Sequence, residues 1–415
     1  MKSLTRPLLI LACGVSLPAL AFAEDAVDYK NATLTGDWGG ARDRLAEAGV
    51  GIEAAYKFDV MGNAAGGIKE GVSALDNLDV IFNFNGEKLL GSHGTTALVH
   101  LLNNNGGKPD AHLAGSAQGI DNIEVPEAAA KLYQAWIQQN FLEDKFSVLA
   151  GLYDLNSEFY VNEPSGIFLH STYGIGTEIS QSGQNGPSIF PFTSPGIRVK
   201  MQPTKNSYVQ AVMLDGVPGD PGHLRGTHIA LHSGDGALVV AEAGYTSGSK
   251  VAVGAWYYTE KFPDQIDVDS FGNPVQKRSD GTYLIGDTKL YREQGSDASQ
   301  GLAAFARIGF AEGDVNPCDY AWSAGLVYTG LIPDRDEGQL GLGINGAHNS
   351  GKFRQATIAG GTPVDNAETA IELTYSDTIT PWLAVQPDIQ YIMNPGTDPA
   401  LDNALVFGAR FTLTF

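Results

Sequence analysis

The stretch Leu405-Val406-Phe407-Gly408-Ala409-Arg410-Phe411-Thr412-Leu413-Thr414-Phe415 ends the chain and decides the fold class. Every second residue from Leu405 to Phe415 is apolar, whereas Gly408, Arg410, Thr412 and Thr414 fall on the opposite face. A period of two residues is typical of a β-strand with one apolar and one polar face. The final stretch therefore predicts a strand that continues to an aromatic last residue.

The same alternation recurs along most of the chain. It is clear in Leu78–Asn85, Tyr133–Asn140, Ile197–Gln202 and Leu383–Tyr391. Amides and charged groups occupy the second face of these stretches, as expected for strands with one face toward water. A soluble β-sandwich and a membrane barrel both alternate in this way, so alternation alone does not separate the two folds.

Composition excludes several classes of protein. The chain has 415 residues, 51 of them Gly, and a formal net charge of −21. The acidic balance argues against nucleic acid as a partner, because a phosphate backbone is bound by clustered Lys and Arg. Two Cys residues exclude a disulfide scaffold. No segment after the N-terminus has 18 consecutive apolar residues, so a closed β-barrel is the remaining way to span a membrane.

The N-terminus predicts export. Lys2 and Arg6 precede the mostly apolar stretch Leu8–Leu20, and Ala21-Phe22-Ala23 matches a cleavage site. Residues 1–23 are therefore predicted to be a signal peptide, with a mature chain that starts at Glu24. The apolar stretch, roughly 13 residues long, is too short to cross the membrane as a helix. A lipoprotein signal that ends at Cys13 is a weaker alternative.

Three features favour a membrane barrel over a sandwich. The polar faces carry charged residues in strand after strand, which a water-filled lumen tolerates, and the strand ends are rich in aromatic residues. The third feature is the aromatic end at Phe415. At roughly 24 residues per strand and connection, the mature chain holds about 16 strands. We therefore predict an all-β fold, a transmembrane antiparallel β-barrel formed by residues 50–415.

The segment before the barrel, residues 24–49, breaks the alternation. Thr35–Gly49 predicts a short helix, which Asp37 can cap and Gly49 ends. The first strand is expected at Val50–Val60. Its outward residues are expected to be Ile52, Ala54, Tyr56 and Phe58, and its inward charges Glu53, Lys57 and Asp59.

Motifs for catalysis or for a cofactor are weak. Gly341–Gly346 matches G-x-G-x-x-G, but no helix-forming sequence follows, so it predicts a strand with glycines. Asp267 and Asp269 precede Gly272, but Phe271 occupies a ligand position of a calcium loop and no Glu follows at its twelfth position. The sequence therefore predicts no catalytic residues, no metal site, no cofactor and no enzymatic activity.

The run Leu34-Thr35-Gly36-Asp37-Trp38-Gly39-Gly40-Ala41-Arg42 resembles the N-terminal signature of the OprB family of carbohydrate-selective porins. Further segments resemble the same family in the same order: Trp136–Asp154, Phe305–Arg307, and the C-terminal part from Glu372 to Phe415. The resemblance implies a 16-stranded barrel in the bacterial outer membrane, with a narrowed channel that prefers sugars such as glucose.

Sugar chemistry suggests which side chains line the channel. A sugar presents hydroxyl groups and weakly apolar C–H faces, so charged residues, amides and one aromatic residue suit the constriction. The aromatic candidate is Trp136, which lies between Gln134 and Gln138 on a polar face; the alternative is a lipid-facing position. The polar candidates on inward faces are Arg198, Arg307, Asp388, Gln390 and Arg410. Asn103–Asn105 is expected to be a loop tip or a constriction loop, and Trp38 is expected to pack the short helix against the barrel.

Two functions from different classes remain open. The first is passive, sugar-selective diffusion through an outer-membrane porin, and the second is a secreted β-rich glycosidase or carbohydrate-binding protein. On the first reading, the expected partners are small sugars, outer-membrane lipid and lipopolysaccharide, and the barrel assembly machinery that reads Phe411, Leu413 and Phe415. The chain is expected to be a monomer or a homotrimer.

Overall fold

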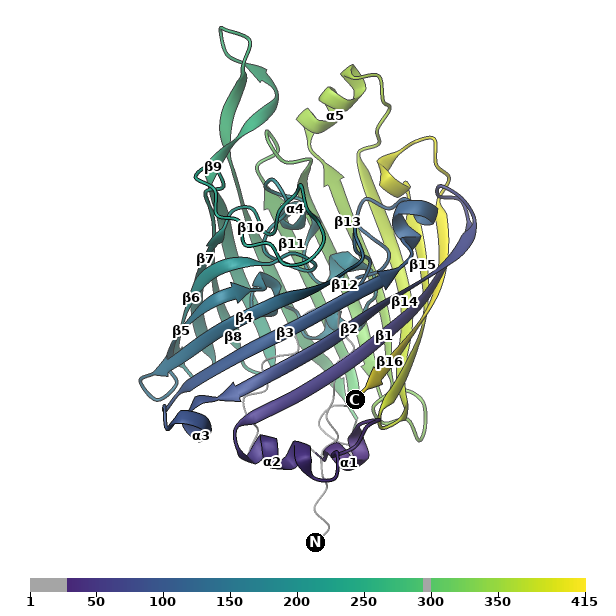
Figure 1. The fold of residues 1–415 in the computed structure, drawn as a ribbon. Helices are drawn as coiled ribbons and strands as arrows, with labels where there is room; N and C mark the ends of the chain where they lie inside the picture. Colours follow the sequence, from purple (N-terminus) through teal and green to yellow (C-terminus); the bar gives the residue numbers. More distant parts are fainter. Residues whose placement is uncertain (1–27, 294–299) are drawn as a thin grey trace.

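The computed structural model describes residues 28–293 and 300–415. The predicted signal peptide, residues 1–23, lies outside these residues. Within the described chain, sixteen antiparallel strands form a closed barrel in which each strand pairs with its sequence neighbours and β1 pairs with β16. The predicted fold class is therefore confirmed, and Figure 1 shows the tilted strands around the barrel.

The strands are β1 (Val50–Ala65), β2 (Gly71–Asn85), β3 (Thr95–Gly106), β4 (Ala129–Phe141), β5 (Phe146–Tyr153), β6 (Ser194–Thr204), β7 (Ser207–Asp215), β8 (Ala237–Thr246), β9 (Ser249–Val268), β10 (Pro274–Arg292), β11 (Gly301–Ala311), β12 (Cys318–Thr329), β13 (Gln339–Asn349), β14 (Ala367–Thr380), β15 (Leu383–Met393) and β16 (Ala404–Thr414). The α-helices are α1 (Tyr29–Ala32), α2 (Ala41–Glu47), α3 (Gly86–Leu90), α4 (Thr177–Ser180) and α5 (Gly351–Ala359). Single turns of other helix types occur at Asp110–Ala114, Leu155–Ser157, Pro164–Ile167, Ser171–Tyr173 and Pro395–Thr397. None of the helices in the described part of the chain is long and apolar enough to cross a membrane.

Period-two alternation sets the two faces of each strand. In β1, Lys57 and Asp59 are buried, whereas the flanking Tyr56 and Phe58 are only partly buried. The register with β16 places Phe58 opposite Phe411 and Asp59 opposite Arg410. Since directly opposed residues share a face of a sheet, the polar side chains of both strands point into the barrel and the aromatic ones point outward.

The predicted helix before the barrel exists but is shorter than expected. Its core is α2, and Gly40, not Asp37, occupies the N-cap position. Gly40 has a φ of 79° and offers no side chain to cap α2, while the carboxylate of Asp37 accepts a hydrogen bond from the backbone N–H of Gly39. Gly49 ends the segment with a φ of 98°, a conformation that glycine adopts without strain.

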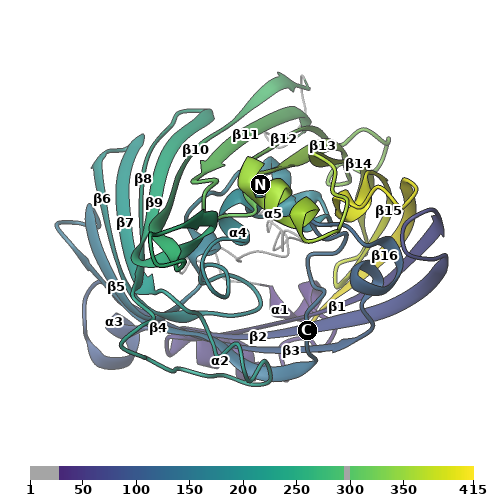
Figure 2. The same ribbon diagram turned by 90° about the horizontal axis from the view of Figure 1, so that it is seen from above.

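Connections at the two rims differ in length. Two-residue connections at 205–206, 247–248 and 381–382 lie at the rim that also bears α1, α2 and the C-terminus (Figure 1). The opposite rim bears α5 and the long connections, among them residues 107–128 and 154–193. These two long connections fold into the barrel, and Figure 2 shows α4, which belongs to the second, inside the ring of strands.

Candidate channel lining

The two inward connections are held by side chains of the barrel wall. We call residues 107–128 the first inward segment and residues 154–193 the second. Backbone N–H groups of Leu169 and His170 donate to the carboxylate of Glu372 on β14, at 2.6 and 3.1 Å. The hydroxyl of Ser116 and the N–H of Ala117 donate to Glu368 on the same strand, at 2.6 and 2.8 Å. Buried backbone groups need such partners, so the inward carboxylates of β14 fix where both segments run.

The second inward segment also has an apolar side. Phe159, Tyr160 and Ile179 pack with inward residues of β7–β10, among them Val240 and Trp256. The burial of this cluster ties the segment to one wall of the barrel. A large part of the lumen along these strands is therefore filled by packed side chains.

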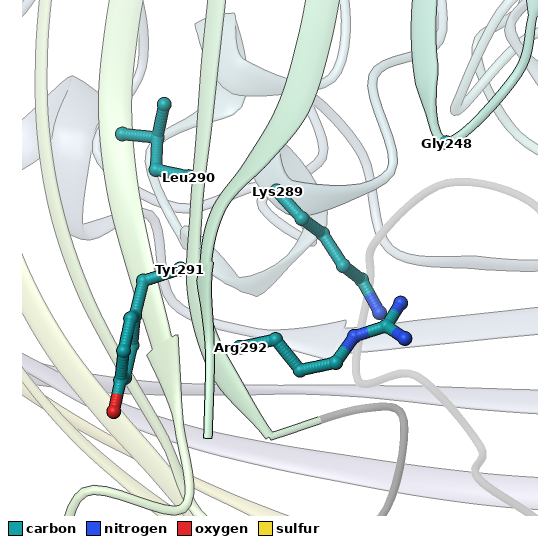
Figure 3. A pocket seen from close by; sticks show the side chains of 5 residues that line it. All are labelled: Gly248, Lys289, Leu290, Tyr291 and Arg292. Carbon is teal, nitrogen blue, oxygen red and sulfur yellow. The ribbon is translucent and has the colours of Figure 1, made fainter. Parts of the chain in front are cut away.

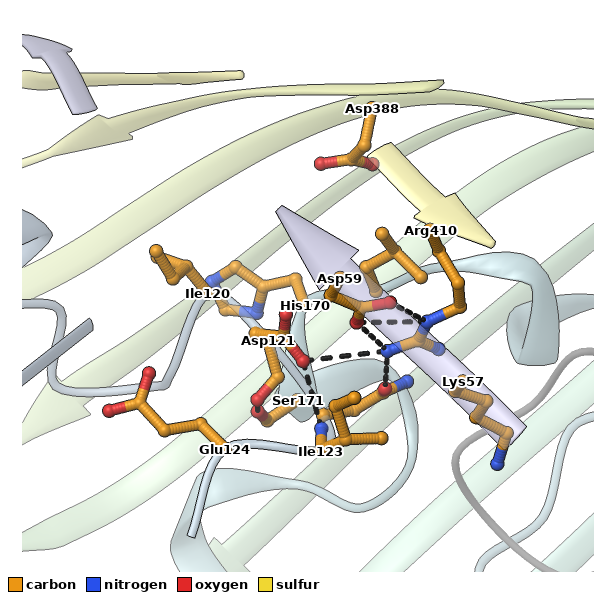
Figure 4. Close-up of polar contacts among 12 residues, drawn as sticks. Lys57, Asp59, Ile120, Asp121, Ile123, Glu124, His170, Ser171, Asp388 and Arg410 are labelled. Carbon is orange, nitrogen blue, oxygen red and sulfur yellow. Dashed lines mark hydrogen bonds and ion pairs between the residues drawn. The ribbon is translucent and has the colours of Figure 1, made fainter. Parts of the chain in front are cut away.

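Arg410 is sealed beneath the first inward segment. Its Nε donates to both carboxylate oxygens of Asp59, at 2.9 and 3.0 Å, and its Nη2 donates to Asp59 at 2.6 Å and to the side-chain oxygen of Asn122 at 2.7 Å. Nη2 also lies 3.4 Å from Asp121, and all three charged side chains are 0% exposed. Figure 4 shows the guanidinium of Arg410 between Asp59 of β1 and the loop that carries Asp121. Arg410 thus lies inside the barrel as predicted, but it anchors a segment and does not face open lumen.

Arg307 has a similar position on β11. Its Nε donates to Ser323 Oγ on β12 at 2.7 Å, and its Nη1 donates to the backbone oxygen of Gly174 at 3.1 Å. The guanidinium also lies 5.5 Å from the ring centre of Tyr160. Gly174 and Tyr160 belong to the second inward segment, so Arg307 is covered by it.

Asp388 and Gln390 lie next to each other on the inner face of β15. Gln390 Nε2 donates to Asp388 Oδ1 at 2.9 Å and to the backbone oxygen of Ile120 at 2.8 Å. Ile120 is part of the first inward segment. Both side chains are buried, and Figure 4 shows Asp388 above the cluster of Arg410, Asp59 and Asp121, which we call the Arg410 cluster.

Arg198 belongs to a cluster with Glu158 and Lys200, and these two partners are more exposed to solvent than Arg198 itself. Its Nε and Nη2 donate to Glu158 at 2.7 and 3.2 Å, and its Nη1 donates to Ser147 Oγ at 2.6 Å. Lys200 Nζ donates to the same carboxylate at 3.3 Å. The side chain of Arg198 is only 2% exposed, whereas Lys200 and Glu158 are 28% and 23% exposed.

Trp136 faces the barrel interior. It pairs directly with Leu98, a buried inward residue of β3, and packs against the apolar cluster of the second inward segment. The lipid-facing alternative therefore does not hold. The side chain of Trp136 therefore packs against apolar residues, in addition to lying between Gln134 and Gln138 on the same face of β4.

Two expectations about single residues are wrong. Asn103–Asn105 is neither a loop tip nor a constriction loop, because all three residues lie within β3. Trp38 is 47% exposed; its ring lies 5.0 Å from the guanidinium of Arg42, and its Nε1 donates to Thr35 Oγ1. Arg42 makes the packing contacts expected of Trp38: it is buried and donates from Nη2 to the backbone oxygen of Ile52 on β1 at 2.7 Å.

The glycines of Gly341–Gly346 have a packing reason. They lie in β13, as the strand reading predicts, and a Cβ at Gly343 would come within 2.5 Å of the Tyr173 hydroxyl. A Cβ at Gly341 would come within 3.0 Å of the Phe168 ring. Phe168 and Tyr173 belong to the second inward segment, so these glycines make room for it.

Some lumen residues carry no clear signal in the sequence. Asp121 and Glu158 lie in stretches without alternation, so nothing predicts that they meet Arg410 and Arg198. Asp79 is on the polar face of Leu78–Asn85, and His100 follows the same period in β3. The alternation predicts their direction but not their contact with each other.

A shallow pocket of about 380 Å³ lies at the rim of short connections, opposite the rim from which the inward segments enter. It is lined by Gly248 and Lys289–Arg292, and Lys289 and Arg292 point to one side of β10 while Leu290 and Tyr291 point to the other (Figure 3). Among the described residues, no group of three or more His, Cys, Asp or Glu side chains is placed to hold a metal ion.

Comparison with known proteins agrees with this geometry. Residues 69–415 match the family described as carbohydrate-selective porin, OprB family. The chain is 26% identical over 443 residues to Porin B of Pseudomonas aeruginosa, which covers 97% of this chain and 95% of that protein. It is 22% identical to the putative porin QuiX of Acinetobacter baylyi over 441 residues, with 98% of each chain covered. The high-pH structure of Pseudomonas putida OprB superposes with a TM-score of 0.83 at 22% identity, covering 94% of this chain and all of that one.

Proposed function

Because the chain belongs to the carbohydrate-selective porin family OprB, it is a sugar-selective porin of the bacterial outer membrane, and we propose that it passes small neutral monosaccharides by passive diffusion. The family and the fold are those of a channel, and we propose that the protein has no enzymatic activity. The observation that carries the finer proposal is the pairing of opposite charges at three places in the lumen. Lys57 is paired with Asp79, Arg198 and Lys200 share Glu158, and Arg410 is shared by Asp59 and Asp121.

Paired charges suit a neutral, polyhydroxylated solute. They offer many hydrogen-bond donors and acceptors, while the opposite charges reduce the field that an ion would feel. The two inward segments supply the narrowing, since they occupy lumen that a 16-stranded barrel would otherwise leave to water. Weak, multiple contacts let a sugar enter and leave again.

The six predicted lining residues receive three different proposed roles. We propose that Arg307, Arg410 and Gln390 act indirectly, because each holds an inward segment in place, and that Asp388 acts through Gln390, from whose amide it accepts a hydrogen bond. Arg198 holds Glu158 and so positions Lys200, which is the more exposed member of that cluster. Trp136 supports the wall beside the second inward segment.

Swelling of proteoliposomes tests the proposed substrate class. Glucose and other hexoses should enter several times faster than a disaccharide at equal osmolarity, and liposomes without protein should not swell. Equal rates for a hexose and a disaccharide would contradict the size limit. Heat-modifiable migration on a detergent gel and conductance steps in a planar bilayer would separate the porin from a secreted glycosidase or carbohydrate-binding protein, which gives neither.

The remaining partners follow from the barrel and its charge. We propose that lipid surrounds the apolar outer face, that lipopolysaccharide contacts the acidic rim through divalent cations, and that the assembly machinery reads the aromatic end of β16. Chemical crosslinking of the folded protein in mild detergent distinguishes a monomer from a homotrimer.

A further inference from the structure

Three polar side chains meet on the inner face of β1, β2 and β3. Asp79 of β2 accepts from Lys57 Nζ of β1 at 3.2 Å on one carboxylate oxygen, and its other oxygen lies 2.9 Å from His100 Nε2 of β3. We call these three residues the Asp79 cluster. Their neighbours along the strands, such as Tyr56, Leu78 and Leu101, belong to the outer face, so the cluster points into the barrel.

The Asp79 cluster differs from the other lumen charges in what covers it. In the described part of the chain, the hydrogen bonds of these three side chains join only one another. Arg410, Arg307 and Gln390 each bond to an inward segment instead, and Asp388 bonds to Gln390. The other partner of the cluster is the Tyr133 ring of β4, which meets the His100 ring edge-on at 5.1 Å and limits how that ring can turn.

Exposure gives the same contrast. The side chains of Lys57, Asp79 and His100 are 10%, 12% and 10% exposed, whereas those of Arg410, Asp59 and Asp121 are 0% exposed. Figure 4 shows Lys57 on the same strand as Asp59, with its side chain apart from the sealed Arg410 cluster. An ammonium group has three N–H donors and a carboxylate has about four acceptor sites, so the cluster retains hydrogen-bonding capacity toward the lumen.

From this geometry we propose that the Asp79 cluster is a binding subsite for the vicinal hydroxyl groups of a monosaccharide on its way through the barrel. One hydroxyl donates to Asp79, and its neighbour accepts from Lys57. The proposal rests on the proposed sugar permeation and adds the residues that a sugar meets. When no sugar is present, the three side chains keep their positions because they hydrogen-bond to one another.

A purely structural role is the competing explanation. The Lys57–Asp79 and Asp79–His100 contacts join three adjacent strands, and such a role would affect folding but not the affinity for sugar. The two roles are separable, because sugar binding can be measured on the folded channel. A matched control is the His348–Asp319 pair, which has the same chemistry at 2.7 Å but lies at the long-loop end of β12 and β13.

The experiment measures block of single-channel current by glucose for the wild type, Asp79→Asn, Lys57→Met and Asp319→Asn, each first shown to be folded by heat-modifiable migration. The half-blocking glucose concentration should rise about three- to tenfold in Asp79→Asn and in Lys57→Met, as expected for the loss of a charge-assisted hydrogen bond. It should be unchanged in Asp319→Asn. An unchanged value in both cluster variants would overturn the subsite.

A second measurement can be made even on variants that fold in low yield. It also distinguishes a failure of the subsite from a failure of the proposed sugar permeation. The ratio of glucose to arabinose entry in proteoliposomes depends on the folded channels alone, and it should shift in the cluster variants because the two sugars place their hydroxyls differently. If the wild type admits no sugar, the proposed function fails. If the wild type admits sugars and the cluster variants keep both the ratio and the half-blocking concentration, only the subsite fails.

Discussion

Arg410 and Asp59 connect the last strand to the first at the seam where the barrel closes. Removing two charges from water is costly, and the cost is recovered only when geometry is good and the remaining hydrogen bonds are satisfied. Asp59 provides a two-oxygen contact and Asn122 provides a further acceptor, while Nη1 of Arg410 has no partner among the described residues. The pair therefore favours one register of β1 against β16, since a shift of one residue would turn Arg410 toward lipid.

Replacement of Arg410 with Met should lower stability more than it alters sugar selectivity. The change leaves Asp59 and Asp121 buried without their cation, which costs on the order of 3–5 kcal/mol in the free energy of unfolding. Urea unfolding of the detergent-solubilised barrel measures the loss. Arg335→Ala is the control: its partner Asp377 lies 3.4 Å away and its side chain is 45% exposed, so its loss should cost less than about 1 kcal/mol. A stable R410M channel with altered glucose block would instead make Arg410 part of the sugar path.

At the scale of elements, closure of the barrel extends beyond the paired strands. The N–H of Leu34 donates to the backbone oxygen of Thr414, and the N–H of Phe415 donates to the oxygen of Ala54. Arg42 adds its bond to Ile52 and has the Tyr29 ring 4.1 Å from its guanidinium. The segment before β1 therefore bonds to both strands of the closing seam.

Deletion of Phe415 should lower the amount of folded protein in the outer membrane and leave sugar selectivity unchanged. The deletion removes the last bond from the C-terminal end to β1 and the aromatic end of the outward row Phe411, Leu413, Phe415. An open strand edge in lipid leaves backbone groups unpaired at several kcal/mol each. Heat-modifiable protein in outer-membrane fractions measures insertion, and swelling rates per folded channel measure selectivity. Normal membrane levels with altered selectivity would place Phe415 in the pore.

A second element-scale feature holds α5 at the rim of long connections. Lys352 of α5 lies 2.6 Å from Asp264, 2.7 Å from Asp267 and 3.0 Å from Asp314. Lys277 of β10 also pairs with Asp314 and Asp264. This network joins the β9–β10 hairpin, the β11–β12 turn and the β13–β14 connection.

The network should hold α5 near neutral pH and release it in acid. The hydrogen bond from Lys277, followed by that from Lys352, lowers the pKa of Asp314 below 3.8. Burial opposes the charge of Lys352, but hydrogen bonds to Asp264, Asp267 and Asp314 outweigh it and raise its pKa above 10.5. The carboxylate contribution is thus present above 3.8 and is lost as pH falls through the lowered pKa of Asp314, while the Lys352 contribution is complete below 10.5. Hydrogen exchange of α5 amides, corrected for intrinsic rates, should be equally slow at pH 5 and 7 and should begin to quicken only below pH 3.8, whereas Lys352→Met should be fast at pH 5 and 7. Equal protection of the wild type and Lys352→Met at pH 7 would contradict the network.

At the scale of the whole molecule, the sequence predicts the barrel well and its interior poorly. Alternation is local, so the faces of strands such as Val50–Val60 and the strand number follow from the chain itself. The inward segments depend on contacts such as Asp121 with Arg410 and Leu169 with Glu372, which join residues more than about 200 positions apart and leave no periodic signal. For that reason the inward direction of Arg307 and Arg410 is predictable, but their burial under a segment is not.

The overall charge distribution should make the channel disfavour organic anions. The formal net charge is −21, and many acidic residues lie at the rim of long connections, among them Asp267, Asp269, Glu312, Asp314, Asp398 and Asp402. The rim is the part of the channel that an approaching anion meets first, so its acidic residues should dominate the field at the entrance, and salt screens that field over about 10 Å at 0.1 M. Gluconate and glucose have similar sizes, so the ratio of their entry rates isolates charge: glucose should be favoured at 10 mM salt and the preference should shrink at 500 mM. Replacement of Asp398 and Asp402 with Asn should reduce the preference at low salt without a change in glucose entry. A preference that is equally strong at both salt concentrations would mean that anions are rejected inside the lumen and not at the rim.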